Sequence, residues 1–480
     1  MQTRHNEIEI SSDDPFKNDA LGRKELEPPL TQFITQTSSP FTLALDSAWG
    51  SGKTTFLKMW EVKLKQAGHV CLYLNAWKND FAQDPLVAVV GELSEAISEA
   101  IKALEPKEKK TELQEKMKTV TKTAALIFKR SIPLAIKLAT HGILDIEGAM
   151  EKNMADFASG IAEDGIKEYE KGKSEIEEFR QALTSLAVSV SKSKNNDNAK
   201  VVIIIDELDR CRPTYAVQLL ERIKHLFDVS GVVFVLGIDR SQLNHSICAL
   251  YGSGFDAVGY LKRFIDLDYR LPEPKSGNYC SYLFKYFGIE DLILSRQGPI
   301  IQDTLEDLKS YLGALMSSAR MSLRVQEQTV SRLRIVLQTI PKGQKLHEIA
   351  LSILLFLREW NIDKYDSFVS KMININIDEL LKTIEELPNK NEAFKEVDFN
   401  MIEAYLLARA NELELHSSRL ENYQKLAHSG SKEPEVCRAQ ELVYIFNKNS
   451  LAQHSRAERT GFSITANRIE PANNFISYGN

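Results

Sequence analysis

The chain has 480 residues, of which 43% are hydrophobic, 26% are charged and five are cysteines. This composition is ordinary for a water-soluble globular chain, and the length suffices for about three domains. The formal charge of −6 argues against a surface built throughout to hold nucleic acid, although a local basic patch stays open. The cysteines lie far apart with no C-x-x-C pair, so the sequence indicates neither a disulfide framework nor a zinc cage.

The start of the chain, MQTRHNEIEISSDD, lacks the apolar segment of a signal peptide. No window of about 18 predominantly apolar, uncharged residues occurs in the sequence, which therefore predicts no transmembrane helix. We expect a cytoplasmic protein, in line with the dispersed cysteines. Peripheral contact with the inner membrane stays open as a second hypothesis.

Five short segments predict the strands of one sheet. Four are continuous apolar runs, as expected for parallel strands that are buried on both faces. The fifth, Ile265–Leu271, alternates apolar and charged residues and predicts a strand at a sheet edge. With the helical patterns between them, these runs indicate an α/β fold with helices covering a parallel sheet. The continuous runs are Phe41–Leu45, Val70–Leu74, Val201–Ile205 and Val232–Ile238.

An insertion of about a hundred residues separates the second strand from the third, which is too long for a simple connection. Residues 107–137 carry nine Lys or Arg against three Asp or Glu, whereas residues 145–180 carry five against eleven. Two helices paired by charge would explain this division. Because basic residues and a proline interrupt the apolar stretch 123–146, the alternative is a basic helix lying on a membrane surface. A capping box at Ser174–Glu177 predicts that a helix begins there.

Beyond about residue 275 the pattern is helical, most clearly over Leu346–Trp360 and more weakly over Met401–Glu414. The residues from Leu451 onward are mostly polar and predict an unpacked tail. The sequence therefore divides into five predicted segments. These are the first part of the core (1–99), a charged helical insertion (100–195), the second part of the core (196–274), a helical lid or effector region (275–450) and the polar tail (451–480).

The clearest functional motif, DSAWGSGKTT at Asp46–Thr55, lies between the first strand and a helical run, which is the context of a phosphate-binding loop. Backbone N–H groups of such a loop surround phosphate oxygens at a helix N-terminus. We expect Lys53 to reach the β and γ phosphates and Thr54 to bind Mg²⁺. Ser47 occupies the first glycine position of the consensus, where it needs a negative φ or strain, so a reduced nucleotide affinity is expected. The expected nucleotide-binding residues of the loop are Ser47, Ala48, Trp49, Gly50, Ser51, Gly52, Lys53, Thr54 and Thr55.

Carboxylates follow the third strand directly, at the end of a parallel strand where α/β sheets bind ligands. We expect Asp206 to hold the Mg²⁺ and Glu207 to orient and deprotonate the attacking water. A glutamate in that second position favours hydrolysis over phosphate transfer to a small acceptor. Asp239 ends the fourth strand, where it either senses the γ-phosphate or caps the following helix.

Taken together, these motifs resemble the KAP family of P-loop nucleoside triphosphatases, in the STAND-like branch of P-loop ATPases. The resemblance covers residues 18 to about 335 and implies an ATPase core with strand order 5-1-4-3-2. It also implies that Gly22 and Arg23 lie near the base and ribose. Many family members carry two membrane-spanning helices in the insertion, which this charged insertion does not match. The motifs are Ala20–Arg23, Trp49–Thr54, Asn75–Trp77, Asp206–Pro213, Val233–Asp239 and Tyr260–Phe264.

An arginine is a further requirement, because charge develops on the transferring phosphoryl group. Arg210, Arg263 and Arg324 are the candidates, and each has a surface ion pair as its alternative role. If a neighbouring chain supplies the arginine, hydrolysis requires a homo-oligomer or a protein complex.

We therefore expect an ATPase that binds ATP and Mg²⁺ and uses hydrolysis as a conformational switch. The resemblance implies a role in bacterial anti-phage defence or in a membrane-associated complex. An ATP-binding scaffold with negligible turnover is the first alternative, motivated by Ser47, and a nucleotide kinase is the second. The sequence names neither the trigger nor the effector partner.

Overall fold

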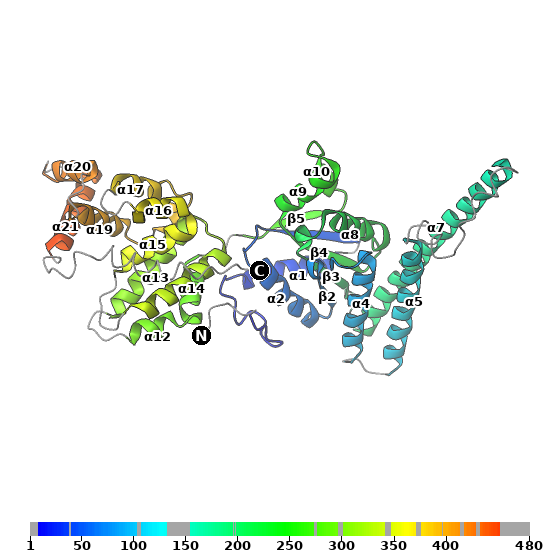
Figure 1. The fold of residues 1–480 in the computed structure, drawn as a ribbon. Helices are drawn as coiled ribbons and strands as arrows, with labels where there is room; N and C mark the ends of the chain where they lie inside the picture. The colour runs from blue at the N-terminus through cyan, green and yellow to red at the C-terminus, as the bar shows by residue number, and fades with distance from the viewer. Residues whose placement is uncertain are drawn as a thin grey trace. The chain divides into compact units, whose positions relative to one another are not determined.

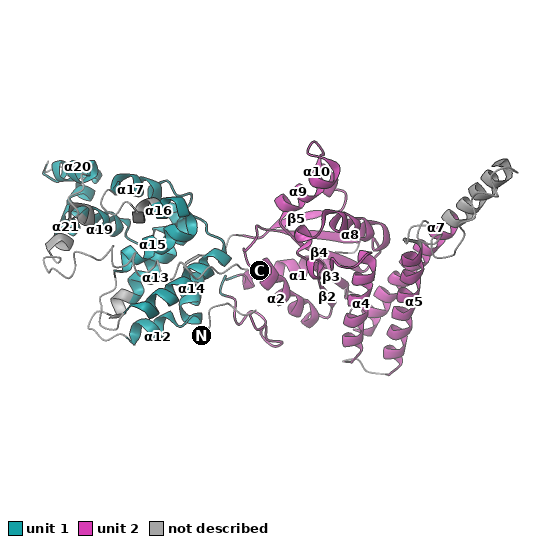
Figure 2. Cartoon of the chain, viewed as in Figure 1, with its two compact units in different colours: residues 1–7, 20–22, 274–480 teal, residues 8–19, 23–273 magenta. Residues whose placement is uncertain are grey.

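The computed structural model describes most of the chain, and its residues group into two compact units (Figure 2). Unit 1 comprises residues 1–7, 20–22 and 274–480, and unit 2 comprises residues 8–19 and 23–273. The five-segment division made from the sequence stays a prediction. The described residues are 8–37, 40–102, 107–131, 154–194, 196, 198–272, 276–295, 301–340, 347–370, 376–395, 397–412, 417–428 and 433–451.

Unit 2 is built on a five-stranded parallel sheet in the order β2-β3-β4-β1-β5. This is the predicted order 5-1-4-3-2 read from the opposite edge, and the predicted α/β fold is confirmed. The four apolar runs form the four longer strands, and the alternating run forms the shorter edge strand. Because all strands are parallel, their carboxyl ends meet at one edge of the sheet. The strands are β1 (Phe41–Asp46), β2 (Val70–Asn75), β3 (Val201–Asp206), β4 (Val232–Ile238) and β5 (Leu267–Arg270).

Different helices cover the two faces of this sheet (Figure 1). On β3, Val202 and Ile204 pack in one apolar cluster with α1 and α2, whereas Ile203 packs in another with α4, α8 and α9. The alternation follows from the two-residue period of a strand. Unit 2 thus has three layers. Its helices on the sheet are α1 (Glu27–Gln36), α2 (Lys53–Gln66), α4 (Pro85–Lys102), α8 (Pro213–Leu226) and α9 (Arg240–Tyr251). Its shorter helices are η1 (Lys24–Leu26), α3 (Ala76–Asn79), η2 (Leu208–Arg210) and α10 (Ala257–Leu261).

The insertion between β2 and β3 contains α5 (Lys107–Ser131) and α7 (Met154–Ser193). Where the side chains are described, these helices meet through buried apolar residues that extend the α4 side of the core. Near the start of α5, Lys109 Nζ donates to the carbonyl of Ser193, the last residue of α7, at 3.4 Å. None of the helices within the described ranges is sufficiently long and apolar to cross a membrane.

One prediction for the insertion is wrong, and part of another lies outside the described residues. The helix start predicted at Ser174 is not observed, because α7 begins at Met154 and continues through Ser174. The residues before Ser174 are rich in Ala, Glu and Lys, which favour helix over a cap. The part of the apolar stretch 123–146 that follows Ser131 is not among the described residues.

The described part of unit 1 is helical and has its own apolar core. Every residue of α15 from Ile349 to Leu357 is buried, so the predicted apolar stripe belongs to a helix that is packed on all sides rather than on one. The helices are α11 (Ser276–Tyr286), α12 (Ile289–Leu294), α13 (Ile301–Ser318), α14 (Leu323–Thr339), α15 (Glu348–Trp360), α16 (Ile362–Ser370), α17 (Ile377–Glu385), α18 (Lys390–Ala393), α19 (Phe399–Glu412), α20 (Ser418–Ala427) and α21 (Pro434–Leu451).

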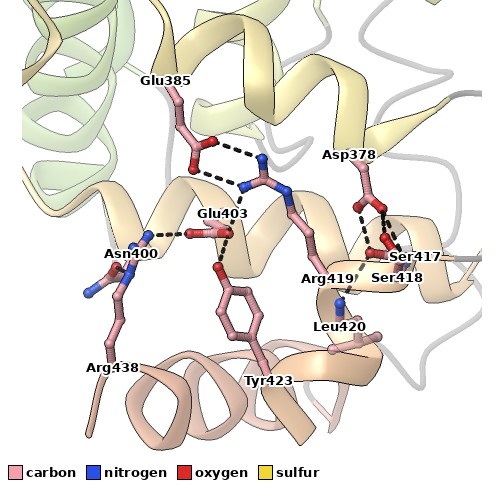
Figure 3. A network of polar contacts seen from close by, with 10 residues as sticks. All are labelled: Asp378, Glu385, Asn400, Glu403, Ser417, Ser418, Arg419, Leu420, Tyr423 and Arg438. Carbon is pink, nitrogen blue, oxygen red and sulfur yellow. Dashed lines mark hydrogen bonds and ion pairs between the residues drawn. The ribbon is translucent and has the colours of Figure 1, made fainter. Parts of the chain in front are cut away.

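A buried polar network joins four of these helices, α17, α19, α20 and α21 (Figure 3). The carboxylate of Glu403 is fully buried and accepts hydrogen bonds from Tyr423 Oη at 2.7 Å and Arg438 Nη2 at 2.8 Å. Arg419 Nη1 contacts the same carboxylate at 3.4 Å, and Nη1 and Nη2 each donate to one oxygen of Glu385 at 2.8 Å. Because a buried charge is stable only when it is paired, these contacts fix how the four helices pack.

Candidate active site

The glycine loop connects β1 to α2 with the backbone that the motif predicts. Gly50 and Gly52 have φ of +70° and +83°, which favour glycine, and α2 begins directly at Lys53. Ser47 does not have a positive φ, and its N–H donates to the Ile238 carbonyl at 3.1 Å. Serine therefore fits the first glycine position without backbone strain.

Lys53 lies inside this loop and is buried. Its Nζ donates to the Ser47 carbonyl at 2.8 Å. Burial lowers the pKa of Lys53 despite four nearby carboxylates that raise it. In order of their effect, these are Asp209, Asp206, Asp239 and Asp46. The lysine is thus held at the carboxyl edge of the sheet, where a phosphate would replace the carbonyl as its partner.

Asp206, the last residue of β3, meets the first turn of α2. Its Oδ2 accepts hydrogen bonds from Thr54 Oγ1 at 2.6 Å and from Tyr73 Oη at 2.8 Å. The carboxyl is fully buried, and burial raises its pKa in spite of these hydrogen bonds. A bound cation would offset that burial penalty, and a carboxylate beside a hydroxyl is a donor set that suits Mg²⁺. The residues present therefore fit the predicted metal.

Glu207 follows with a left-handed backbone at φ +61°, which is strained for a glutamate. Both of its carboxylate oxygens are engaged: Oε1 contacts Arg210 Nη1 at 2.8 Å, and Oε2 accepts from Asn75 Nδ2 at 2.8 Å. Of the three candidate arginines, Arg210 therefore pairs with the glutamate expected to act as the base. Tyr73 and Asn75 were not predicted as site residues, although their alternate positions place both side chains on one face of the sheet at the end of β2, which pairs with β3.

Two half-exposed tryptophans flank Arg210. The rings of Trp49 and Trp77 lie 5.8 Å and 5.7 Å from the guanidinium carbon. The Trp49 indole N–H also donates to Asp209 Oδ2. Asp209 is buried, and its other oxygen, Oδ1, has no hydrogen-bond partner in the part of the chain that the structure describes. These contacts tie the glycine loop to the segment that follows β3.

Asp239 directly follows β4 and caps α9, which is one of its two predicted roles. Its Oδ1 accepts from the N–H groups of Ser241 and Gln242 at 3.1 Å and 3.2 Å. The same carboxylate is one of the four near Lys53, so it also lies close to the glycine loop. Its sensing role stays a prediction.

Arg23 belongs to unit 2 and is buried. Its Nη2 donates to the Pro272 carbonyl at 3.3 Å, while Nε and Nη1 have no partner among the described residues. Burial lowers the pKa of Arg23 to about 10, and Asp19 acts in the opposite direction. Gly22, with φ +67°, belongs to unit 1. The role of both residues near the base stays a prediction.

The other two candidate arginines are not brought to the glycine loop within unit 2. Arg263 is exposed and lies just before β5, next to Asp266, whose N–H donates to the Thr42 carbonyl near the start of β1. This is the amino edge of the sheet, opposite the loop, which argues against action on a nucleotide in the same chain. Arg324 lies at the start of α14 in unit 1.

A glycine loop around a buried lysine, a hydroxyl against a strand-end aspartate and a following glutamate define the P-loop nucleoside triphosphatase class. Residues 29–334 match the model of the KAP family P-loop domain. Since this match covers more than half of the chain, the protein belongs to the KAP family.

Two further comparisons concern more distant proteins. The phage T7 exclusion protein of Escherichia coli (strain K12) is 20% identical over 243 residues, which make up 49% of this chain and 30% of that protein. The matched segment thus spans less than a third of that relative. The solved structure of the Aeropyrum pernix ORC2 protein, in ADPNP–ADP complexes, is 12% identical over 98% of both chains, with a TM-score of 0.31.

Proposed function

We propose that this KAP-family protein hydrolyses Mg-ATP and uses the reaction as a conformational switch. The observation that carries the proposal is the meeting of Lys53, the Thr54–Asp206 contact and Glu207 at one edge of the sheet. Family membership supports nucleotide binding, and the engaged Glu207 supports regulated turnover.

In the proposed reaction each group has one task. The loop N–H groups and Lys53 bind the β and γ phosphates, and Thr54 and Asp206 hold the Mg²⁺, which would neutralise charge on the phosphates. Glu207 accepts a proton from the attacking water. It does so after its carboxylate leaves Arg210 and Asn75, because both oxygens are occupied in the present arrangement.

The occupied carboxylate explains why a switch is favoured over continuous turnover. While Arg210 and Asn75 bind both of its oxygens, Glu207 does not act as the base. Its release also frees the Arg210 guanidinium beside the reacting phosphate. Nucleotide binding or a partner would have to supply the free energy of that release. We also propose that a second copy of the chain supplies the catalytic arginine, Arg263 or Arg324, so that hydrolysis depends on assembly.

The experiment is phosphate release from ATP by the full chain, with Mg²⁺ or with EDTA, alongside nucleotide binding by calorimetry. Glu207→Gln should lower kcat by roughly 100-fold or more while ATP still binds, and Lys53→Ala should abolish binding. Asp84→Asn is the matched control, since it makes the same carboxylate-to-amide change in an ion pair with Arg222 outside the site. ATP binding without phosphate release, unaffected by Glu207→Gln, would instead establish the scaffold. Label transferred to an added nucleotide acceptor would establish the kinase.

We further propose a role in defence against bacteriophage, which the name of the E. coli relative suggests. Phage plaque counts on cells that express the wild-type chain should fall relative to cells that express Lys53→Ala. Equal counts at equal protein levels, across a panel of phages, would contradict this role.

A further inference from the structure

Asp209 is a buried carboxylate that the proposed function leaves without a task. It lies three residues after Asp206, in the 3₁₀ turn η2, and only 6% of the residue is exposed. One oxygen accepts the Trp49 indole N–H, which holds the carboxylate against the glycine loop. The other oxygen, Oδ1, has no hydrogen-bond partner among the described residues. A buried carboxylate oxygen without a partner is costly, and such groups occur where a ligand or water binds.

The surroundings of Asp209 indicate which ligand this oxygen would take. Both oxygens of Glu207 are bound by protein groups, whereas Oδ1 of Asp209 is a buried acceptor without a partner among the described residues. Asp209 is one of four carboxylates near Lys53, and its contact with Trp49 places it beside the glycine loop. A water molecule in front of the γ-phosphate has two hydrogens, and a single base can hold only one of them.

Building on the proposed ATPase function, we propose that Asp209 is a catalytic residue whose Oδ1 accepts a hydrogen bond from the attacking water. The water oxygen forms a bond to the γ-phosphorus, and the bond from that phosphorus to the β,γ-bridging oxygen breaks, with its electron pair leaving on ADP. The proton that the water loses passes to Glu207 and then to solvent. Asp209 stays ionised throughout and fixes the orientation of the second hydrogen.

The test compares three variants of the full chain. Asp209→Asn keeps one oxygen that can accept the Trp49 indole N–H. It replaces the other oxygen with an NH2 group and removes the negative charge. We expect kcat to fall by roughly 100-fold, with KM for ATP and the Kd of a fluorescent ATP analogue changed by less than about threefold. Asp84→Asn, the control outside the site, should retain the wild-type kcat. Trp49→Phe removes the indole donor but leaves the Asp209 carboxylate, so its kcat should fall by less than tenfold.

Each outcome decides between an active and an anchoring carboxylate. If Trp49→Phe lowers kcat as much as Asp209→Asn does, Asp209 only anchors the tryptophan, and the inference is overturned. An unchanged kcat in Asp209→Asn overturns it as well, while leaving the ATPase function intact. Absence of turnover in the wild-type chain overturns both proposals. Should Asp209→Asn unfold in a thermal melt, Asp209→Ser, which is smaller and neutral, replaces it in the same comparison.

Discussion

His69 gives the stability of unit 2 a pH dependence that the structure allows us to work out. The residue directly precedes β2 and is 2% exposed. Its Nδ1 accepts the Lys200 backbone N–H at 3.1 Å, so the ring proton lies on Nε2, which donates to Thr35 Oγ1 at 3.1 Å. The Thr35 hydroxyl donates in turn to the Thr31 carbonyl. Protonation of Nδ1 would break the Lys200 hydrogen bond and bury a charge.

Burial, together with the charge of Lys200, lowers the pKa of His69 from its ordinary value of 6.5 to about 4. The unfolded chain therefore binds this proton between pH 6.5 and 4, whereas the folded chain does not. The stability that unit 2 gains from keeping His69 neutral is fully present above about pH 6.5 and is lost as the pH falls toward 4. With about 1.4 kcal/mol for each pKa unit, the full loss from this one group is about 3 kcal/mol.

The assay is urea unfolding of the wild-type chain and of His69→Asn at several values between pH 4 and pH 8. Asparagine can still accept the Lys200 N–H through its side-chain oxygen but does not titrate. The difference in unfolding free energy between the two proteins should therefore change by about 3 kcal/mol over this range, in the direction that disfavours the wild type at low pH. A difference that stays constant with pH would refute this explanation of the buried ring.

Two other perturbations have expected outcomes. Gly237→Ala should destabilise the chain by about 1–3 kcal/mol in urea unfolding and lower ATPase activity. A Cβ at this position would lie 2.4 Å from Leu57 Cδ1 and 2.7 Å from Asp206 Oδ1. Wild-type activity in this variant would contradict the reasoning. Glu403→Gln should destabilise unit 1 by about 1–3 kcal/mol, since the hydrogen bonds from Tyr423 and Arg438 lose their charged acceptor, and an unchanged thermal midpoint would show that the network contributes little.

The sequence was sufficient to predict the sheet and the parts of the site that depend on local spacing. Continuous apolar runs predicted the four longer strands, the glycine loop directly follows β1, and Asp206 ends β3. The start of α7 could not be predicted in this way. The Ser174 signal was local, whereas the helix already begins at Met154, twenty residues earlier.

Contacts between strands and loops account for what the sequence did not predict. Asn75 reaches Glu207 because β2 pairs with β3 in a register that sets Asn75 opposite Asp206. Arg210 was one of three candidate catalytic arginines with an ion pair as its alternative role, and the turn after β3 brings it to Glu207. The Trp49–Asp209 hydrogen bond joins residues far apart in the chain, and no spacing rule indicates it.

The insertion that contains α5 and α7 begins and ends at neighbouring positions, as the contact between Lys109 in α5 and the Ser193 carbonyl in α7 indicates. Such a module can gain or lose helical turns at its far end without shifting any strand of the sheet. The length of these two helices is therefore free to evolve separately from the nucleotide chemistry.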